Sequence, residues 1–172
     1  MNEVHLEKDY SCPLPDDFRF EISNHCNLRC IACFTGLDAK GMPRGFMKYG
    51  DFYDLFMKIK KRARRILFSD WGEPLMNPDH LKIFKLCSTA NVWTRISTNL
   101  VYKEFSAAYA EELVRSGINR IVASIDGGSQ ASYGRYRVGG DFDRAMRNLG
   151  ILQKTKTKLK SRSPVLVWKC LV

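Results

Sequence analysis

Short apolar stretches alternate along the chain with longer stretches in which apolar residues recur at every third or fourth position. The first pattern is typical of buried strands and the second of amphipathic helices. The expected strands cover residues 18–22, 65–69, 92–97, 119–125 and 165–172. The expected helices cover residues 51–63, 77–90, 105–115 and 141–156. This order predicts parallel βαβ units in an α/β fold.

Three residues mark the expected ends of two helices. Asn77 is the expected N-cap of the second helix, with Pro78 at its first helical position. Gly117 is expected to close the third helix, because glycine readily adopts the left-handed conformation that ends many helices. The glycine- and serine-rich segment between residues 126 and 141 is expected to be a loop.

Polar or reactive residues follow four successive strands. In parallel α/β folds, functional residues lie beyond the carboxyl ends of the strands, so we expect these residues to meet on one rim. They are Cys26, Cys30 and Cys33 after the first strand, Gly72, Glu73 and Pro74 after the second, Thr98 and Asn99 after the third, and Ser124 and Asp126 at the end of the fourth.

The three cysteines have the spacing C-x3-C-x2-C, which lets one tight loop present three thiolates to one centre. Thiolates hold iron–sulfur clusters, and a cubane cluster normally takes four of them. Three thiolates would leave one iron open to an external ligand, as in a catalytic zinc site. Two alternatives stay open. One is a structural zinc site completed by a distant cysteine, since His25 adjoins Cys26 too closely, and the other is three unrelated buried cysteines.

Glu73 and the pair of Ser124 and Asp126 are further candidates for ligand contact. Glu73 could accept a hydrogen bond from an ammonium group, although Gly72 and Pro74 also suit an ordinary strand-to-helix turn. Ser124 and Asp126 share one face of their strand, because side chains alternate along a strand. A hydroxyl beside a carboxylate suits a ribose or an amino-acid moiety, and the alternative is a turn at the end of the strand.

These motifs together resemble the radical SAM superfamily over about residues 18–172. The cysteine loop matches the family's cluster motif, residues 72–74 match its GGEP-type motif, and Ser124 and Asp126 match positions on its fourth strand. The segments Ser-Thr-Asn-Leu, Ser-Ile-Asp-Gly and Tyr-Gly-Arg-Tyr-Arg-Val-Gly-Gly are similar to the SPASM or twitch subgroup. Ala32 and Trp71 depart from the pattern, because an aromatic residue and a glycine are common there.

The resemblance implies a partial (β/α) barrel of the radical SAM type, with about five parallel strands and helices on the outer face. It implies a [4Fe–4S] cluster on the three cysteines, with S-adenosylmethionine chelating the open iron. Reduction of the cluster would cleave S-adenosylmethionine to a 5′-deoxyadenosyl radical, which abstracts hydrogen from a substrate. The subgroup's members often modify peptides or proteins, and an external electron donor such as flavodoxin or ferredoxin would be required.

The resemblance also assigns contacts with S-adenosylmethionine. Glu73 would fix its ammonium group, Ser124 and Asp126 would orient its nucleoside, and Arg137 would meet its carboxylate or the substrate. The cofactor-binding residues predicted in this way are Gly72, Glu73, Pro74, Thr98, Asn99, Ser124, Asp126 and Arg137. We expect residues 1–17 to be an N-terminal extension and residues 18–172 to be a core that is incomplete at its C-terminus, because the family has six βα units.

The 172 residues carry a net charge of +10, concentrated in the runs 58–65 and 154–162. Such charge suits nucleic acid or an acidic partner, whereas the plainer interpretation is two solvated helix ends. No nucleic-acid-binding motif accompanies the runs, so nucleic acid is not the expected partner. Lys60, Lys61 and Arg62 are instead candidates for docking an acidic electron donor.

The sequence contains neither an apolar run long enough for a membrane helix nor a secretory signal, so we expect a cytoplasmic protein without a membrane partner. Cys12, Cys87 and Cys170 are expected to be small buried residues. The competing hypothesis for function is a non-enzymatic iron–sulfur or zinc module for electron transfer or sensing, or an inactive fragment.

Overall fold

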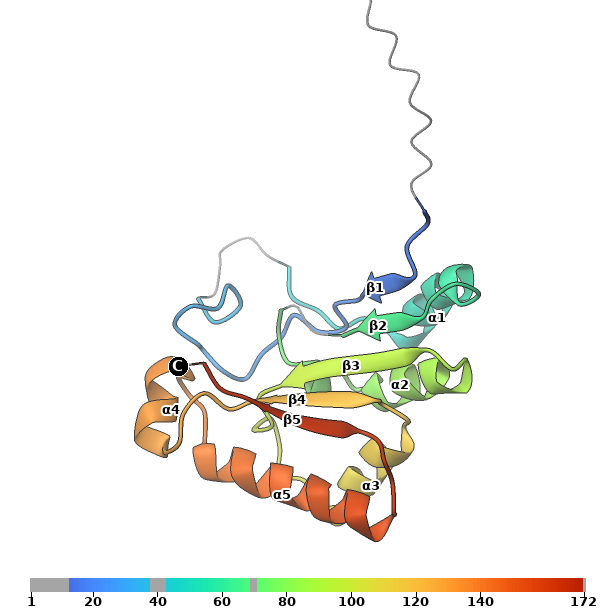
Figure 1. The fold of residues 1–172 in the computed structure, drawn as a ribbon. Helices are drawn as coiled ribbons and strands as arrows, with labels where there is room; N and C mark the ends of the chain where they lie inside the picture. Colours follow the sequence, from blue (N-terminus) through green and yellow to red (C-terminus); the bar gives the residue numbers. More distant parts are fainter. Residues whose placement is uncertain (1–12, 38–42, 69–70, 172) are drawn as a thin grey trace, which may run out of the picture.

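A computed structural model of the chain describes residues 13–37, 43–68 and 71–171. Five parallel strands form one sheet in the order β1-β2-β3-β4-β5 (Figure 1). The strands are β1 (Asp17–Arg19), β2 (Arg65–Leu67), β3 (Trp93–Thr98), β4 (Arg120–Ser124) and β5 (Val165–Lys169). The expected set of five parallel strands is confirmed.

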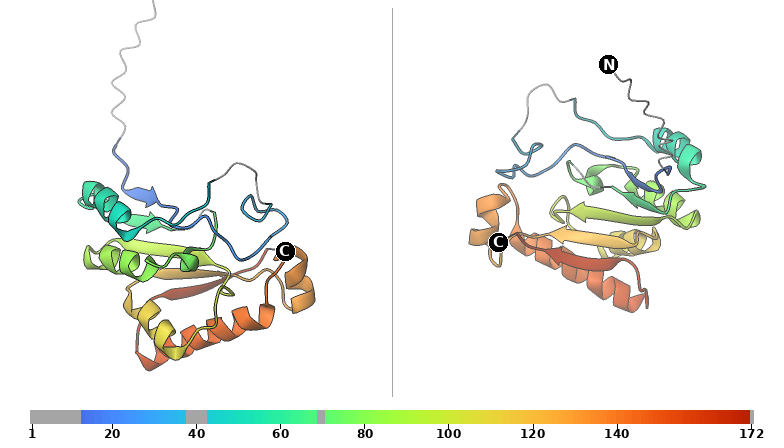
Figure 2. Two further views of the ribbon diagram at one scale, coloured as in Figure 1. Left: turned by 180° about the vertical axis from the view of Figure 1, so that it is seen from behind. Right: turned by 45° about the horizontal axis from the view of Figure 1, so that its top comes forward.

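Four helices cover the outer face of this sheet, and helices that follow one another along the chain pack side by side (Figure 2). These are α1 (Tyr49–Ile59), α2 (His80–Thr89), α3 (Ala107–Arg115) and α5 (Phe142–Lys158). Two short elements, η1 (Pro74–Met76) and α4 (Gln130–Tyr136), lie beyond the carboxyl ends of the strands. None of the helices described is long and apolar enough to cross a membrane.

The two faces of the sheet differ, as β3 shows. Thr94, Ile96 and Thr98 are buried, whereas the alternate residues Arg95 and Ser97 are only half-buried. The buried face packs against apolar side chains from the four covering helices, namely Phe52, Phe56, Ile83, Phe84, Leu113 and Leu152. The sheet therefore has an apolar outer face under the helices and a more polar inner face.

The second helix begins later than the sequence predicts, and Asn77 is not its N-cap. The helix α2 starts at His80, and Asp79 occupies the N-cap position. The Asn77 side chain instead donates hydrogen bonds from Nδ2 to the carbonyls of Ile22 (2.6 Å) and Met47 (2.8 Å). Its Oδ1 accepts from the backbone N–H of Asp79 (2.7 Å). Asn77 is therefore a buried bridge between loops, a role set by tertiary contacts.

The helix α4 lies in the segment expected to be a loop. Ser129 caps its N-terminus, and the Ser132 side chain returns a hydrogen bond to the backbone of Ser129. This reciprocal capping box satisfies free backbone donors and stabilises a short helix despite its glycine. The expected end of α3 is confirmed, since α3 ends at Arg115 and Gly117 has a φ of 81°.

The cysteines outside the loop differ in their surroundings. Cys87 is fully buried in α2, as expected. Cys170 follows β5 and is exposed, so the prediction that it is buried is wrong. Its strand ends at Lys169, which leaves its side chain beyond the packed sheet. Cys12, like residues 1–12 of the expected extension, Ser69 and Val172, lies outside the described residues.

Candidate iron–sulfur and cofactor site

A pocket of about 280 Å³ opens at the carboxyl ends of the strands. Its lining comes from the loop after β1, the turn after β2, and the strands β3, β4 and β5, together with the segment after α4. The lining residues are Cys26, Leu28, Cys30, Cys33, Gly72, Glu73, Arg95, Ser97, Thr98, Asn99, Ser124, Arg137 and Lys169. The four predicted polar clusters therefore meet at one place, while Pro74 and Asp126 are buried and do not line the pocket.

The loop that carries the three cysteines is held by a segment far along the chain. The backbone N–H groups of Arg29 and Ile31 donate to the carbonyls of Val138 (2.9 Å) and Tyr136 (3.2 Å). Within the loop, the N–H of Cys33 donates to the carbonyl of Cys30 (3.1 Å). The connection between α4 and α5 therefore determines where the cysteine side chains are presented.

Hydrogen-bond donors point toward two of the thiols. The sulfur of Cys26 accepts from the backbone N–H of Leu28 (3.4 Å) and from Asn99 Nδ2 (3.8 Å). The sulfur of Cys30 accepts from Arg137 Nη1 (3.7 Å). Burial raises the pKa of Cys26 to about 11, and it also raises the pKa of Cys30, where the charge of Arg137 acts in the opposite direction. Donors placed in this way suit thiolates that ligate a metal cluster.

The donor set fits an iron–sulfur cluster. Among the residues that the structure describes, no three His, Cys, Asp or Glu side chains come close enough to hold a single metal ion, as a structural zinc site would require. The three thiols instead line one pocket together, and in a cluster each thiolate binds its own iron. Cys26, Cys30 and Cys33 would therefore hold three irons of a cubane cluster and leave the fourth accessible from the pocket.

Glu73 is a buried carboxylate with three protein donors. Its Oε1 accepts from the Thr98 hydroxyl (2.7 Å) and from the backbone N–H of Leu75 (3.1 Å), and its Oε2 accepts from the backbone N–H of Asn99 (2.7 Å). Burial raises the pKa of Glu73 to about 6, although these hydrogen bonds lower it. The predicted residues Glu73, Thr98 and Asn99 thus form one unit, and the carboxylate retains acceptor capacity for a further donor in the pocket.

Gly72 lets the turn after β2 approach the cysteine loop closely. Its φ is 80°, and a Cβ atom there would lie 2.3 Å from the carbonyl oxygen of Ser23. The next residue, Glu73, donates its N–H to the carbonyl of His25 (2.6 Å), directly before Cys26. Only glycine fits this backbone position, which couples the Glu73 turn to the cysteine loop.

Asp126 acts through Arg137 rather than lining the pocket. Its Oδ2 accepts from Arg137 Nε (2.6 Å), and its Oδ1 accepts from the backbone N–H of Leu171 (2.7 Å). Both side chains of the pair are largely buried. Ser124 lies two residues earlier and does face the pocket. The carboxylate of Asp126 therefore fixes the guanidinium of Arg137 beside Cys30.

Sequence reasoning missed four lining residues. Arg95 and Ser97 share the inner face of β3, Lys169 ends β5, and Leu28 lies within the cysteine loop. The period-two alternation on β3 could have placed Arg95 and Ser97 on one face. It could not have shown which face is open, because that depends on where the helices pack.

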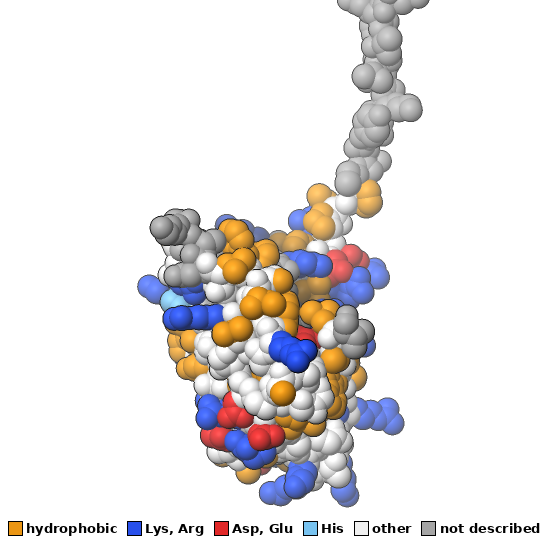
Figure 3. Space-filling view, turned by 90° about the vertical axis from the view of Figure 1, so that its left-hand side faces the viewer, with side chains coloured by type: hydrophobic (Ala, Val, Ile, Leu, Met, Phe, Trp, Pro, Cys, Tyr) orange, Lys and Arg blue, Asp and Glu red, His pale blue; other side chains and the backbone are white. Residues whose placement is uncertain are grey.

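Two aromatic residues form a pair near the cysteine loop. The ring centroids of Phe34 and Trp71 are 5.5 Å apart, and both side chains are 44% exposed. Ile31 and Leu37 are also exposed, and Figure 3 shows hydrophobic side chains gathered on this end of the molecule. Trp71, which stands where the family motif commonly has a glycine, therefore belongs to an aromatic pair at the surface. Its partner Phe34 follows Cys33 directly.

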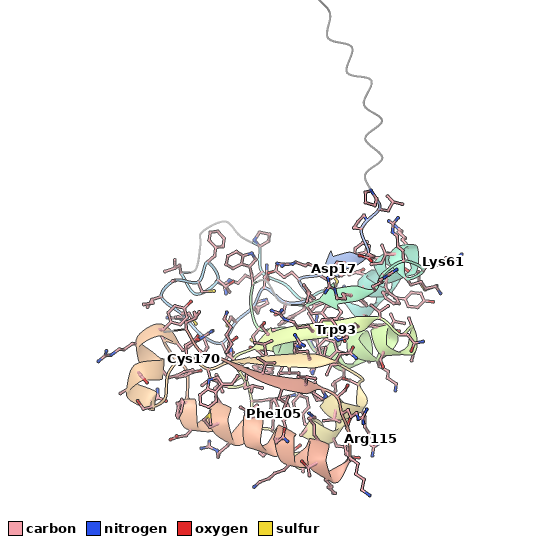
Figure 4. All side chains as sticks on the ribbon, viewed as in Figure 1. Asp17, Lys61, Trp93, Phe105, Arg115 and Cys170 are labelled. Carbon is pink, nitrogen blue, oxygen red and sulfur yellow. The ribbon has the colours of Figure 1, made fainter. Side chains whose placement is uncertain are left out.

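The basic run after α1 lies away from the pocket. Lys61 lies at one end of the molecule and Cys170, next to the pocket residue Lys169, lies at the other (Figure 4). An electron donor docked on Lys60, Lys61 and Arg62 would be separated from the cysteine loop by the length of the sheet. The docking of an acidic electron donor on these three cations stays a prediction, and a donor bound there would lie far from the cysteine loop.

Comparison with known proteins identifies the family. The family model described as the radical SAM superfamily matches residues 20–166. The chain belongs to the radical SAM superfamily. AdoMet-dependent heme synthase of Methanosarcina barkeri (strain Fusaro) is 26% identical over 136 residues, which are 78% of this chain and 38% of that protein. GTP 3′,8-cyclase of Desulforamulus reducens is 30% identical over 114 residues, which are 63% of this chain and 33% of that protein.

These radical SAM relatives are enzymes, and the chain spans less than half of their length. Two solved structures that hold S-adenosylmethionine share its fold. Native anSMEcpe with bound AdoMet has a TM-score of 0.67 at 20% identity, covering 91% of this chain and 43% of that chain. SuiB of Streptococcus suis bound to S-adenosylmethionine has a TM-score of 0.66 at 21% identity, covering 83% and 32%. The expected partial barrel of the radical SAM type is confirmed.

Proposed function

We propose that this chain is the core of a radical SAM enzyme, with a [4Fe–4S] cluster on Cys26, Cys30 and Cys33 and S-adenosylmethionine on its open iron. The observation that carries the proposal is the single pocket that these thiols share with Glu73 and Ser124. When bound and reduced, the cluster supplies the electron that cleaves S-adenosylmethionine and yields a 5′-deoxyadenosyl radical for hydrogen abstraction.

The chain's own residues would bind and orient the cofactor. Glu73, held ionised by its three donors, would accept from the ammonium group, and an opposite charge there would lower its raised pKa. Ser124 would contact the nucleoside from β4. Arg137 would place a positive charge beside Cys30 and the carboxylate of the cofactor, in the orientation that Asp126 imposes. The partly enclosed pocket would limit the access of water.

The proposal extends to the setting in which the enzyme acts. A peptide or protein substrate is supported by the resemblance to the SPASM or twitch subgroup, and the fold neighbour SuiB has been solved with its precursor peptide SuiA. A one-electron donor such as flavodoxin or ferredoxin is required by the proposed chemistry. We propose a cytoplasmic location, in which residues 18–172 form the radical SAM core and residues 1–17 precede it.

Anaerobic reconstitution with iron and sulfide tests the proposal. The chain should bind about four irons per molecule and become brown. Dithionite and S-adenosylmethionine should then release 5′-deoxyadenosine and methionine. Cys30→Ser should abolish both results, whereas Cys170→Ser, at an exposed cysteine outside the pocket, should leave them unchanged. Purification with tightly bound zinc, and no iron after reconstitution, would instead support the competing zinc module.

A further inference from the structure

We propose that the inner face of the sheet contains an anion subsite formed by Arg95, Lys169 and Ser97, which binds a carboxylate or phosphate group of the substrate. This inference rests on the proposed function, because it names the chemical class of the substrate that shares the pocket with the thiols. All three residues line that pocket.

The strand register places these residues on the same side of the sheet. Arg95 and Ser97 are two positions apart on β3, so their side chains leave the same face. Lys169 pairs with Ser124 across β4 and β5, and both residues line the pocket. Arg95 lies three residues before Thr98, which is roughly 10 Å deeper along the strand. The subsite therefore extends from the middle of the inner face to the rim.

Arg95 has a buried donor without a partner. Its Nε is buried and makes no hydrogen bond with any residue that the structure describes. Among the described residues, neither the Arg95 guanidinium nor the Lys169 ammonium takes part in an ion pair of 4.0 Å or less, whereas Arg137 is paired with Asp126. A buried polar group costs free energy until it finds a partner. An anion that the guanidinium binds would give Arg95 the ion-pair partner that it lacks among the described residues.

In the part of the chain that the structure describes, the Glu73 carboxylate in the same pocket is paired with neither Arg95 nor Lys169. Glu73 receives hydrogen bonds from Thr98, Asn99 and Leu75, and no hydrogen bond or ion pair joins it to Arg95 or Lys169 in the described part of the chain. Glu73 would also meet the cofactor's ammonium group. The charge of Arg95 and Lys169 is therefore available to a ligand.

The side-chain chemistry of the subsite suits an oxyanion. A guanidinium presents parallel N–H donors that match two oxygens of a carboxylate or phosphate. The Ser97 hydroxyl can donate to a third oxygen, and Lys169 adds a charge whose direction is less constrained. Arg95 is placed on a strand, so its backbone position is rigid. We expect this subsite to orient one end of the substrate while another part faces the cofactor.

Calorimetric titration of the metal-free chain at low salt tests the subsite, with inorganic phosphate and succinate as separate probes. We expect Arg95→Gln to weaken binding of the preferred probe at least tenfold, and Arg95→Lys to weaken it less. Lys85→Gln removes the same charge from the outer side of the molecule, on α2, and should leave binding unchanged. The probe that binds more tightly identifies the substrate group as a phosphate or a carboxylate.

Several results would overturn the subsite. These are no binding of either probe to the unaltered chain, equal binding to the chain and to Arg95→Gln, or equal weakening by Arg95→Gln and Lys85→Gln. Circular dichroism checks that Arg95→Gln is folded, and Ser97→Ala, which removes one donor, gives a second variant with an expected smaller loss. If Arg95→Gln weakened S-adenosylmethionine binding as much as probe binding, the anion would be the cofactor's carboxylate, which would overturn the assignment to substrate.

Failure of the subsite and failure of the proposed function give different results. If the subsite alone is wrong, reconstituted chain releases 5′-deoxyadenosine while Arg95→Gln binds the probes normally. If the proposed function alone is wrong, no cluster forms, yet Arg95→Gln still loses the probes. Measuring iron content, 5′-deoxyadenosine release and probe binding on the same variants separates the two cases.

Discussion

The two faces of β3 carry neighbouring residues with opposite surroundings. Ile96 is fully buried against the helices, whereas Arg95 and Ser97 on either side of it line the inner pocket. On the outer face, Phe68 lies with its ring 5.6 Å from Phe52 and 5.4 Å from Phe84, centroid to centroid. The difference indicates that the outer face stabilises the fold, while the inner face leaves polar groups free for ligands.

The largest expected difference in the free energy of unfolding is between two substitutions at adjacent residues of β3. Ile96→Ala should lower the free energy of unfolding by about 2–5 kcal/mol, because it removes buried methyl groups and leaves a cavity. Ser97→Ala, on the adjacent residue, should change it by less than about 0.5 kcal/mol. Urea unfolding followed by circular dichroism measures both. Equal losses would show that the inner face is as important for stability as the outer face.

The ion pair of Asp126 and Arg137 is expected to be an exception to this difference between the faces. It lies beside the pocket, yet its loss should destabilise the fold. Asp126→Ala leaves a largely buried guanidinium without its carboxylate, which we expect to cost about 3 kcal/mol of stability. Glu111→Ala removes a carboxylate from an exposed pair with Arg115 and should cost less than about 1 kcal/mol. The same urea assay compares them. A small loss for Asp126→Ala would mean that the pair contributes only orientation.

A substitution at Gly72 tests how closely the turn after β2 approaches the backbone of the cysteine loop. Gly72→Ala should destabilise the chain by roughly 1–3 kcal/mol, because the φ of 80° is strained for alanine and the new Cβ meets the backbone of Ser23. Gly150→Ala lies inside α5 with open space around its Cβ, so it should stabilise by about 1 kcal/mol. Opposite shifts in the unfolding midpoint are expected, and shifts of the same sign would contradict the close approach at Gly72.

The smallest expected effect concerns pH and Glu73. Burial raises the pKa of Glu73 from 4.5 to about 6, so the folded chain binds this proton more tightly than the unfolded chain. The stability that protonated Glu73 contributes is therefore fully present below pH 4.5 and is lost as the pH rises through 6. Between these values the unaltered chain should lose roughly 1–2 kcal/mol relative to Glu73→Gln, which does not titrate. Urea unfolding at several pH values measures the difference. Glu111→Gln serves as the exposed control, and identical pH profiles for the chain and Glu73→Gln would contradict the raised pKa.

The strands and the placement of the polar clusters could be predicted from the sequence, because both follow from local periodicity and from the parallel topology. The cysteine spacing and Glu73 are recognisable as motifs that resemble those of a known family. The prediction that Asn77 is an N-cap is wrong because its side chain donates to the carbonyls of Ile22 and Met47, and no local pattern reports such distant partners.

The helix α4 and the subsite residues show two further limits. Glycine and serine between residues 126 and 141 suggested a loop, yet a capping box of two serines begins a helix there. Nothing in the sequence marks Arg95 and Lys169 as site residues, because a lone cation on a strand is ordinary. Their meeting in one pocket depends on the register of three strands and on which face the helices cover.

The hydrogen bonds between the α4–α5 connection and the cysteine loop have a consequence for biosynthesis. Arg137 donates to Cys30 across 107 residues of sequence, and the carbonyls of Tyr136 and Val138 hold the loop backbone. During translation the three cysteines leave the ribosome well before the α4–α5 connection is made. The nascent chain therefore exposes free thiols while it lacks the structure that would position them, so assembly of the proposed cluster would have to wait until most of this sequence has been synthesised.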